Sequence, residues 1–525
     1  MELHKKLMTV ALTVLITLTL VARLGFCAPV MDCGDIKNLT FTDFAFGKPI
    51  TLTSATIVAA DAAKNMPEHC EVKGTVWPEI GFRLVLPTKT WNGRFVHAGG
   101  SGFDGVIDPQ SVIPVRLPQG YAVAANDGGH SSTNIFDGSF AYNPPDNSNP
   151  NAAQKLVDYA YRSSHETANL AKKIIKAYYG SAPQYSYWYG CSNGGREGLQ
   201  ELQRYPADFN GYVIGAPYIL AADVTMNALW TEKSLSGDGA IAIDKLPLLG
   251  QAIYDKCDAL DGVQDGLIDD PRKCAFDPEK DLSKCAGDVG GPSCFTTKQI
   301  LALQKIYGGP KNSSGKQLYP GWPVGAENVP RSWNPWFIGP MPLQLLAGEN
   351  FMKYIAFDPP KGPTWDWKTF NFDTDPPRYA TRAALLSPTK TDLSQAKALG
   401  RKVIHYHGWA DAALNPLMSI NYYESVRGAM GDAATSEFYR YYMVPGMAHC
   451  RGGIGCGNVD WLAPLVDWVE NGVAPGALVG QGNDSSGNAR SRPICLYPEV
   501  PRYKGTGDIN NAENFGCVKP DAQAR

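Results

Sequence analysis

The sequence places one serine, Ser192, where its hydroxyl can act as a nucleophile. Residues 185–204 read YSYWYGCSNGGREGLQELQR: an aromatic, strand-like stretch, then a turn rich in glycine, then a helix-like stretch. A serine flanked by small residues at a strand-to-helix corner is typical of a nucleophile elbow, because the tight turn holds the hydroxyl clear of the sheet. Short glycine-serine turns are also common in loops, so the strand before Ser192 and the helix after it are the context that this interpretation requires.

A hydroxyl nucleophile needs a histidine that takes its proton and a carboxylate that holds the histidine in one tautomer. In hydrolases built on an elbow of this kind, the acid and then the histidine follow the serine, on loops at strand ends. Asp411 follows the strand-like run 403–407, and His449 follows the run 438–444. We therefore predict a catalytic triad of Ser192, Asp411 and His449.

Other residues offer alternatives to these two. Asp411 could instead cap a helix that begins at Ala412. Asp127 and His130 form a rival pair of acid and base, but they precede the serine, which is the wrong order for this fold, so we expect a structural or cleft-lining role. Three further histidines lie inside strand-like runs, where a core or edge position is the expected role: His97, His405 and His407.

Two cysteines adjoin the predicted catalytic residues. Cys191 immediately precedes Ser192, and Cys450 immediately follows His449. If Ser192 and His449 form a hydrogen bond, their neighbours come close enough for a disulfide. Such a bridge would tie the elbow to the histidine loop and fix the base against the nucleophile.

The alternation of strands and helices predicts an α/β protein with a mostly parallel sheet and helices on both faces. A long helix is expected over residues 152–179, with Asn151 at its start and Gly180 at its end, and a shorter one over 461–470. Buried strands are expected at 82–86, 95–98, 121–125, 185–190, 212–214, 402–408 and 438–444.

The chain of 525 residues is too long for one ordinary core. Between about residues 216 and 395 the alternation is lost, and the stretch is rich in proline, glycine and tryptophan. We interpret residues 219–395 as a lid domain inserted into an α/β-hydrolase catalytic domain that comprises residues 28–218 and 396–525.

The N-terminus and the composition indicate an exported protein. Residues 1–27 have a positive start, an apolar run and a small-residue exit, which is the pattern of a signal peptide. No later apolar run is long enough to span a bilayer, so we expect a secreted or periplasmic protein without a membrane segment. The formal net charge of −3, with both signs spread evenly, argues against nucleic acid as a partner. The oligomeric state does not follow from the sequence.

Removal of Cys27 with the signal peptide leaves eleven cysteines, an odd number, so at least one thiol remains. No C-x-x-C pair of the zinc type is present, and disulfides are the expected use of the others. Spacing suggests local bridges, although it does not fix the connectivity: Cys33 to Cys70, Cys257 to Cys274, Cys285 to Cys294 and Cys495 to Cys517. The fate of Cys456 stays open.

Three motifs resemble the signature of the tannase and feruloyl esterase family: GCSNGGR at 190–196, HGWAD at 407–411 and GMAHC at 446–450. In that family a disulfide joins the neighbours of the serine and the histidine. The resemblance covers nearly the whole mature chain, including the insertion between the serine and the aspartate. It implies a serine carboxylesterase that hydrolyses esters of aromatic acids, without an organic cofactor.

Feruloyl esters are the first expectation for the substrate, and galloyl esters or a related aryl ester, such as the terephthalate monoester that one family member hydrolyses, are the alternatives. Outside this class, the chain could be an inactive secreted protein that binds polyphenols or carbohydrate, or a secreted serine peptidase. The complete order of serine, acid and histidine argues against a binding protein. Neither Arg331 nor Arg196 can be assigned to an acidic substrate group from the sequence. Five aromatic residues of the insertion could face an aromatic acid or pack its core: Trp333, Trp336, Phe337, Trp365 and Trp367.

An acidic loop in the insertion suggests a metal site. Residues 257–267, CDALDGVQDGL, space three carboxylates at intervals of three and four, and such hard oxygen ligands suit Ca²⁺. A solvated acidic loop is the alternative. The loop resembles the calcium loop of the family, which implies a structural Ca²⁺ held by these five residues: Asp258, Asp261, Asp265 and the main-chain oxygens of Val263 and Leu267.

An ester hydrolase also needs backbone N–H groups where negative charge develops on the carbonyl oxygen. One is expected from Asn193, the residue after the nucleophile. The other is expected from the glycine-rich turn at residues 97–103, where Gly100 is the first candidate and Ser101 the alternative.

Overall fold

The structure, a computed structural model, describes residues 28–41, 48, 50–107, 112–484 and 486–520. The predicted signal peptide, residues 1–27, lies outside the described residues. In this part of the chain, no helix has the length and apolar character needed to cross a membrane.

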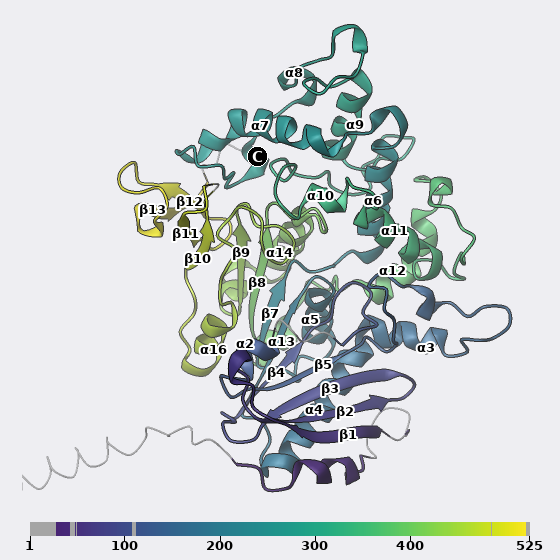
Figure 1. Ribbon diagram of the computed structural model, residues 1–525, viewed down its shortest axis with the longest axis vertical. Helices are drawn as coiled ribbons and strands as arrows, with labels where there is room; N and C mark the ends of the chain where they lie inside the picture. Colours follow the sequence, from purple (N-terminus) through teal and green to yellow (C-terminus); the bar gives the residue numbers. More distant parts are fainter. Residues whose placement is uncertain (1–27, 42–47, 49, 108–111, 485, 521–525) are drawn as a thin grey trace, which may run out of the picture.

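A nine-stranded sheet is the centre of the molecule (Figure 1). The strand order is β1-β2-β3-β5-β4-β6-β7-β8-β9. Neighbours from β5 to β9 pair in parallel, whereas β1, β2 and β3 form an antiparallel extension at one edge. The strands are β1 (Thr51–Val58), β2 (His69–Val76), β3 (Ile80–Pro87), β4 (Arg94–Ala98), β5 (Ala122–Asn126), β6 (Tyr185–Cys191), β7 (Gly211–Gly215), β8 (Lys402–Gly408) and β9 (Tyr439–Val444).

Helices cover both faces of this sheet, as expected for buried parallel strands. On one face, the apolar sides of α4 (Ser163–Tyr179), α5 (Asn193–Arg204) and α14 (Pro416–Met430) pack into one core. On the other, α2 (Ile113–Arg116) and α16 (Leu462–Asn471) pack into a second core. The mostly parallel α/β architecture predicted from the sequence is therefore confirmed.

Two antiparallel hairpins near the C-terminus were not predicted. They are β10 (Leu478–Asn483) with β11 (Ala489–Ile494), and β12 (Val500–Tyr503) with β13 (Phe515–Val518). Their residues are mostly polar or half-exposed, so the sequence carries no strong apolar alternation there. Strands β1 and β2 were missed as well.

The long helix expected over 152–179 is interrupted. It consists of α3 (Ala152–Val157), a π-helical turn over Asp158–Arg162, and α4. Gly180 ends α4 in the left-handed conformation, as predicted, whereas Asn151 stands at the N-cap without a side-chain hydrogen bond. A π-helical turn leaves main-chain carbonyls without their usual helical partners. Two of these carbonyls, of Tyr159 and Ala160, accept hydrogen bonds from Arg196 of α5.

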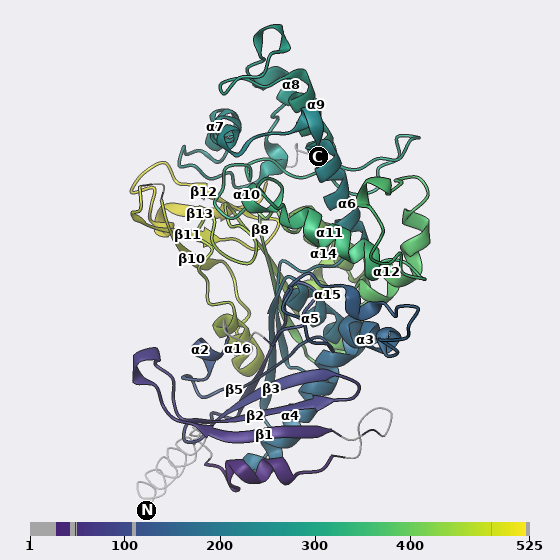
Figure 2. The ribbon, with the colours of Figure 1, turned by 45° about the vertical axis from the view of Figure 1, so that its right-hand side comes forward.

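The insertion leaves the sheet after β7 and returns at β8, its neighbour. Its helices are α6 (Ala221–Ser234), α7 (Leu246–Cys257), α8 (Pro278–Asp281), α9 (Thr297–Gly308), α10 (Trp333–Trp336), α11 (Leu343–Tyr354), α12 (Ala380–Leu386) and α13 (Ser394–Ala398), and the short α15 (Asp432–Ser436) follows later in the chain. Residues between 241 and 338 form a separate apolar core, whereas α6 and α11 pack into the first core of the sheet. Figure 2 shows α7, α8 and α9 at the end of the molecule farthest from β1. Only the middle of the predicted lid thus has a core apart from those of the sheet, and this core also takes in Ala410 and Ala412.

Five disulfides are present, and all five pairings expected from the sequence are confirmed: Cys33–Cys70, Cys191–Cys450, Cys257–Cys274, Cys285–Cys294 and Cys495–Cys517. Cys456 remains a buried thiol. Its Sγ lies 3.6 Å from the main-chain oxygen of Arg490.

Candidate active site

Ser192 lies at a tight corner between β6 and α5. Its φ of 64° and ψ of −123° fall where side chains other than glycine are strained, which is characteristic of a nucleophile elbow. The turn closes so far that a Cβ on Gly190 would lie 2.3 Å from the main-chain oxygen of Gly194. The main-chain N–H of Ser192 donates to Gly215 of β7 over 3.0 Å, which fixes the corner to the sheet.

Asp411 and His449 lie on the loops that follow β8 and β9, as predicted, and they form a hydrogen bond. His449 Nδ1 lies 2.7 Å from Asp411 Oδ2. The other carboxylate oxygen of Asp411 accepts the main-chain N–H groups of Ala413 and Leu414 at 2.8 and 2.9 Å. The alternative interpretation of Asp411 as a helix cap is not confirmed, because the next helix, α14, begins at Pro416 and Asn415 is its N-cap. The two bonds instead close a turn directly after Asp411.

Asp411 is held in its ionised form. Burial by itself would raise the pKa of this carboxyl group, since only 1% of the residue is exposed. The electrostatic interaction with His449 and the hydrogen bonds from His407 and His449 outweigh burial and hold the pKa of Asp411 below its ordinary value.

His407 is a contact of this pair that the sequence did not reveal. Its Nε2 lies 3.1 Å from Asp411 Oδ2, and its Nδ1 lies 2.7 Å from the Ser419 hydroxyl. The position inside a strand suggested a core histidine, and burial agrees. Its place four residues before Asp411, at the carboxyl end of the same strand, is the signal that could have indicated the contact.

The Cys191–Cys450 disulfide joins the elbow to the histidine loop. The two Cα atoms are 5.9 Å apart although 259 residues separate them in the chain. Cys450 has a positive φ of 62°, so the histidine loop, like the elbow, turns sharply at this point. Ser192 and His449 consequently open onto one pocket, together with Asn193.

This pocket is mainly apolar. Among the residues that the structure describes, its lining contains no lysine, arginine, aspartate or glutamate. It is lined by Gly102, Phe103, Phe136, Ser192, Asn193, Tyr218, Val224, Thr225, Trp336, Gln344, Ala347, Ala413, Leu414 and His449. Trp336 of α10 packs edge-to-face against the His449 ring, with 5.6 Å between the ring centroids.

Apart from Ser192, Asn193 and His449, the pocket wall has three polar side chains, and all three already donate hydrogen bonds to the main chain. The Tyr218 hydroxyl donates to the carbonyl oxygen of Ala221 over 2.8 Å. Gln344 Nε2 donates to the carbonyl oxygens of Ala412 and Ala413, at 2.9 and 2.6 Å. The Thr225 hydroxyl lies 2.8 Å from the carbonyl oxygen of Ala222. A ligand in the pocket therefore meets few unsatisfied polar groups.

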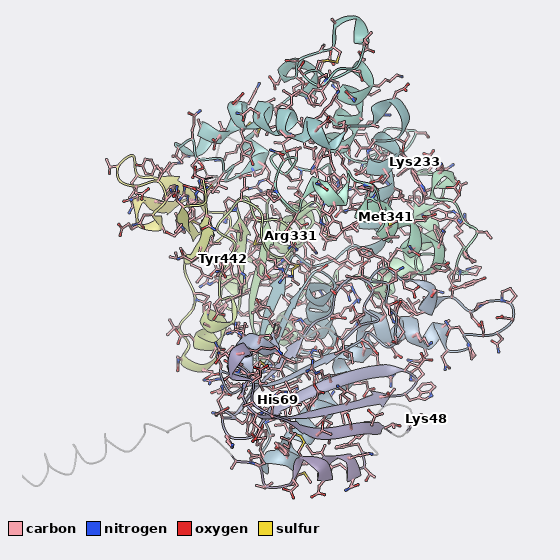
Figure 3. All side chains as sticks on the ribbon, in the orientation of Figure 1. Lys48, His69, Lys233, Arg331, Met341 and Tyr442 are labelled. Atoms are coloured by element: carbon pink, nitrogen blue, oxygen red, sulfur yellow. A yellow bond between two sulfur atoms is a disulfide. The ribbon has the colours of Figure 1, made fainter. Side chains whose placement is uncertain are left out.

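The other aromatic candidates of the insertion have a packing role. Trp333 and Phe337 are buried in the core of the insertion, and Trp365 and Trp367 pack partly buried against the core of the sheet. Arg331 is exposed, and Figure 3 labels it near the centre of the view. Its side chain lies next to Gly452, in the loop after His449. It is not part of the pocket lining.

The oxyanion donor expected from Gly100 is engaged elsewhere. The main-chain N–H of Gly100 donates to the Glu197 carboxylate over 2.9 Å, so the structure does not support this residue in the hole. Glu197 of α5 accepts the hydrogen bond from the Gly100 N–H. The sequence could not show this contact, because the glycine-rich turn and α5 meet only in the folded chain. Ser101, the alternative, remains as the partner of Asn193.

A buried polar network lies directly under the elbow. The Asn193 side chain donates to Asp104 and, over 3.2 Å, to Glu197. Its Oδ1 accepts from Arg196 Nε at 2.6 Å and from the Tyr159 hydroxyl at 3.1 Å. The network thus ties the glycine-rich turn to the start of α5.

Arg196 and Asp104 show how the charges of this network are balanced. Arg196 donates to the carbonyl oxygens of Tyr159 and Ala160, at 2.7 and 2.9 Å, and both belong to the π-helical turn. Because Arg196 is fully buried, it has the packing role that was one of its two interpretations. Burial, and then the charge of Glu197, raise the pKa of Asp104 well above its ordinary value.

The rival pair Asp127 and His130 is placed away from the triad. Asp127 accepts main-chain N–H groups from Gly81, at 3.0 and 3.1 Å, and from Gly129, at 2.9 Å, which is a structural role. His130 stacks on Phe140 with 3.9 Å between the ring centroids, and burial lowers its pKa to about 4.

The acidic loop of the insertion has the donor chemistry of a Ca²⁺ site. Asp258, Asp261 and Asp265 lie together with Asp269, a buried carboxylate that the sequence interpretation missed. Burial, and then the charges of Asp261 and Asp265, raise the pKa of Asp269 well above its ordinary value. Burial is also the main cause that raises the pKa of Asp261, to about 6. Crowded carboxylates of this kind fit a hard dication.

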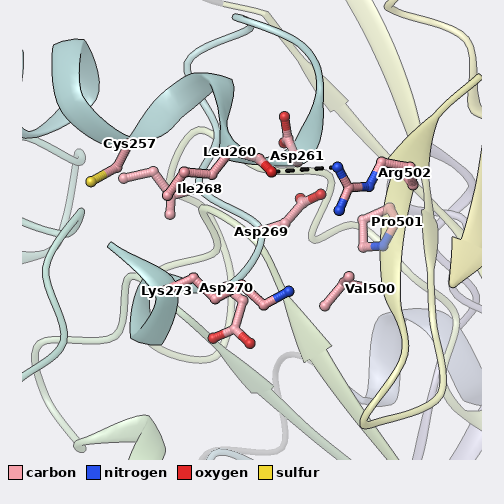
Figure 4. Close-up of a pocket in the computed structure, with 10 residues that line it drawn as sticks. All are labelled: Cys257, Leu260, Asp261, Ile268, Asp269, Asp270, Lys273, Val500, Pro501 and Arg502. Carbon is pink, nitrogen blue, oxygen red and sulfur yellow. Dashed lines mark hydrogen bonds between the residues drawn. The ribbon is translucent and has the colours of Figure 1, made fainter. Parts of the chain in front are cut away.

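Arginines from the C-terminal hairpins close this loop. Arg492 forms an ion pair with Asp265, and Arg490 donates to the main-chain oxygen of the same residue at 2.9 Å. Asp261 and Asp269 line a small pocket against β12, where Arg502 points to the carbonyl oxygen of Leu260 (Figure 4). The Cys257–Cys274 disulfide spans the loop.

Comparison with known proteins identifies the family of the chain. Residues 64–518 match the profile of the family described as tannase and feruloyl esterase. The chain belongs to this family. The chain is 34% identical to mono(2-hydroxyethyl) terephthalate hydrolase of Piscinibacter sakaiensis. The alignment of 537 residues covers 88% of this chain and 87% of that protein. It is 32% identical to a probable feruloyl esterase of Arthroderma benhamiae, over 87% of this chain and 84% of the relative.

Solved structures of this esterase family share the fold. Feruloyl esterase B from Aspergillus oryzae superposes with a TM-score of 0.78 at 26% identity and covers 89% of this chain and 97% of its own. Tannin acyl hydrolase from Aspergillus niger gives a TM-score of 0.71 at 23% identity, over 94% and 97% of the two chains, and supports the fold alone. The α/β-hydrolase fold is confirmed, and the protein is a carboxylic ester hydrolase.

Removal of the Cys191–Cys450 bridge should reduce turnover more than substrate binding. In the double variant Cys191→Ala/Cys450→Ala, we expect kcat to fall roughly tenfold or more, because a small displacement of a base from its nucleophile is costly, with little change in KM. Kinetics on methyl ferulate, at a temperature where circular dichroism shows both proteins folded, measure the effect.

The matched control is Cys285→Ala/Cys294→Ala, which removes a bridge far along the insertion and should leave kcat near that of the wild type. Peptide mapping of the active enzyme under non-reducing conditions supplies the second check. Free thiols at Cys191 and Cys450 in fully active protein would contradict this account of the bridge.

Proposed function

We propose that this protein is a secreted serine carboxylesterase that hydrolyses esters of aromatic acids, with feruloyl esters as the preferred class, through an acyl-enzyme on Ser192. The observation that carries the proposal is that Ser192 and a hydrogen-bonded His449–Asp411 pair open onto one apolar pocket. The printed names of the relatives, feruloyl esterase among them, support the same class of reaction.

In the proposed mechanism, His449 takes the proton of the Ser192 hydroxyl as the oxygen attacks the ester carbonyl. Asp411 keeps the imidazole oriented through Nδ1 and stabilises the imidazolium. Main-chain N–H groups of Asn193 and Ser101 stabilise the oxyanion, and the network under Asn193 holds these two segments together. His449 then protonates the leaving alcohol, and it activates the water that releases the acid.

The pocket supports an uncharged aromatic acid. A carboxylate on the far side of the ring would be buried in the lining without a cation, and an unpaired buried charge is strongly unfavourable. The three hydroxyls of a galloyl group would meet a wall whose polar side chains already donate to the main chain. A feruloyl group, with one hydroxyl and one ether oxygen, suits this wall best, and galloyl esters are the second candidate.

We further propose a structural Ca²⁺ in the acidic loop, held by Asp258, Asp261, Asp265 and the main-chain oxygens of Val263 and Leu267. The ion would neutralise the crowded carboxylates and fix the insertion against the C-terminal hairpins, with no part in the reaction. Export to an oxidising compartment is part of the proposal, and the five disulfides support it.

Substitution of Ser192 by alanine should abolish esterase activity without loss of the fold. We expect kcat on methyl ferulate to fall by roughly 10⁴-fold or more, because the covalent route is lost. A fluorophosphonate probe should label Ser192 in the wild type and leave the variant unlabelled. Unchanged turnover in Ser192→Ala would disprove the assignment, and a wild type without labelling or turnover would favour the binding-protein alternative.

A matched pair of esters tests the preference for an uncharged acid. Dimethyl terephthalate and monomethyl terephthalate have the same ring and the same scissile ester and differ by one carboxylate. We expect kcat/KM to be at least about tenfold higher for the uncharged ester, since the pocket lining offers no cation. Methyl ferulate, methyl caffeate and methyl gallate complete the panel.

Equal or faster hydrolysis of the monoester would contradict the expected preference. Exposed Arg331 would then be the residue to replace by alanine, because its side chain lies beside the loop that follows His449.

Removal of calcium should lower thermal stability and leave the chemistry of the triad intact. We expect EDTA to lower the Tm of the wild type, with recovery on addition of Ca²⁺, because the carboxylates of the loop repel one another without a cation. Asp258→Asn should have a lowered Tm that EDTA does not lower further, whereas Asp255→Asn, an exposed neighbour on α7, should behave like the wild type. A wild-type Tm that does not respond to EDTA would refute the calcium site.

A further inference from the structure

A second cluster of ligand-type side chains lies at the far end of the elbow helix. It consists of His165 on α4, Glu201 on α5 and Asp208 in the turn between α5 and β7. One ligand atom from each lies within 4.8 Å of the other two. Glu201 is nine residues after Ser192, which is about 13 Å along a helix, so the cluster is separate from the catalytic pocket.

Glu201 is the unusual member of this cluster. The residue is fully buried, and neither carboxylate oxygen has a hydrogen-bond donor within reach in the described part of the chain. A buried carboxylate without a partner is strongly unfavourable, and proteins avoid it by pairing, protonation or metal binding. Asp411, by contrast, is equally buried but receives four hydrogen bonds.

The neighbouring cation does not resolve the charge of Glu201. The Lys172 ammonium donates to the main-chain oxygen of Asp208 and lies 3.9 Å from Asp208 Oδ1, so it is engaged with Asp208. No ion pair links Lys172 to Glu201 among the described residues.

His165 gives the cluster a nitrogen ligand and access to solvent. Its Nδ1 lies 2.6 Å from Asp208 Oδ2, and 28% of its side chain is exposed. The ring is held in place by stacking on Tyr205, with 3.7 Å between the ring centroids. A cation can therefore reach the cluster from outside and find an imidazole that is already oriented.

We propose that His165, Glu201 and Asp208 form a binding site for a divalent transition-metal ion of the zinc class. One imidazole nitrogen with two carboxylate oxygens is a donor set that suits Zn²⁺, and the exposed side of His165 leaves a position for water. The ion supplies the positive charge that Glu201 lacks. It clamps α4 to the end of α5 and to the turn before β7, and it thereby braces the helix that carries the nucleophile.

Zinc binding to the full mature chain tests this site. The protein is stripped with chelator and then kept in excess Ca²⁺, so that the acidic loop is occupied by its own ion. Isothermal titration with Zn²⁺ should show one site per chain, and Zn²⁺ should raise the Tm measured by differential scanning fluorimetry. In Glu201→Gln and in His165→Ala, we expect the affinity to fall roughly tenfold or more.

Glu232→Gln is the matched control. Glu232 is likewise a buried glutamate with an unpartnered oxygen, but it lies on α6 outside the cluster, and its replacement should leave zinc binding unchanged. Should Glu201→Gln fail to fold, His165→Ala, at a partly exposed position, still decides the matter. Absence of a stoichiometric site in the wild type, or equal affinity in the wild type and both ligand variants, would overturn the proposal and leave Glu201 as a protonated core residue.

Discussion

The disulfide between Cys191 and Cys450 is the constraint on which the active site depends. It links two loops that are 259 residues apart in the chain, and each of these loops carries one of the proposed catalytic side chains, Ser192 or His449, immediately beside its cysteine. Because both loops turn with positive φ at Ser192 and Cys450, neither geometry is the one that the backbone prefers by itself. The covalent bond, the parallel pairing of β6 to β9 through β7 and β8, and the Asp411–His449 hydrogen bond together place His449 and Ser192 at one pocket.

Hydrogen bonds compensate the buried charges around the elbow. Asp411 receives donors from two histidines and two main-chain N–H groups. Under Ser192, the Asn193 amide bridges Asp104 and Glu197, and Arg196 is satisfied by the carbonyls of the π-helical turn. A densely hydrogen-bonded network of this kind favours one arrangement, because the loss of a donor leaves a buried polar group without a partner. One oxygen of Asp104, Oδ2, is the exception, since it is buried without a hydrogen bond. The irregular helix is thus part of the machinery that positions the nucleophile.

The insertion contributes to the site in two different ways. Its middle part has its own core, which includes Ala410 and Ala412 on either side of Asp411, so the acid loop is packed by the insertion. Its α6, α10 and α11 supply the pocket wall through residues such as Val224, Trp336 and Gln344. Specificity in this fold therefore depends on a segment that lies outside the sheet, whereas the reacting groups lie on the loops of the sheet.

The sequence by itself determined the local chemistry of the protein. Small residues around Ser192 permit a tight corner, and the order of Ser192, Asp411 and His449 along apolar runs predicts the order of the strands that carry them. The positions of Cys191 and Cys450 beside Ser192 and His449 predict their disulfide. These inferences succeeded because each depends on spacing within a few residues or on the order of strands. The antiparallel strands β1 and β2 and the C-terminal hairpins escaped prediction. Strands β1, β10 and β12 are largely exposed or half-exposed, and the buried positions of β2 and β11 include Gly74, Arg490 and Arg492, so none of them forms an apolar run.

Only the tertiary structure decided which groups meet across the fold. Glu197 takes the N–H of Gly100, His407 joins Asp411, and Trp336 alone of the five aromatic candidates lines the pocket. Asp269 and Glu201 are ordinary acidic residues in the sequence, and their burial next to other carboxylates is what makes them notable. Burial and long-range hydrogen bonding depend on the packing of segments that are distant in the chain, and no local pattern of residues specifies them.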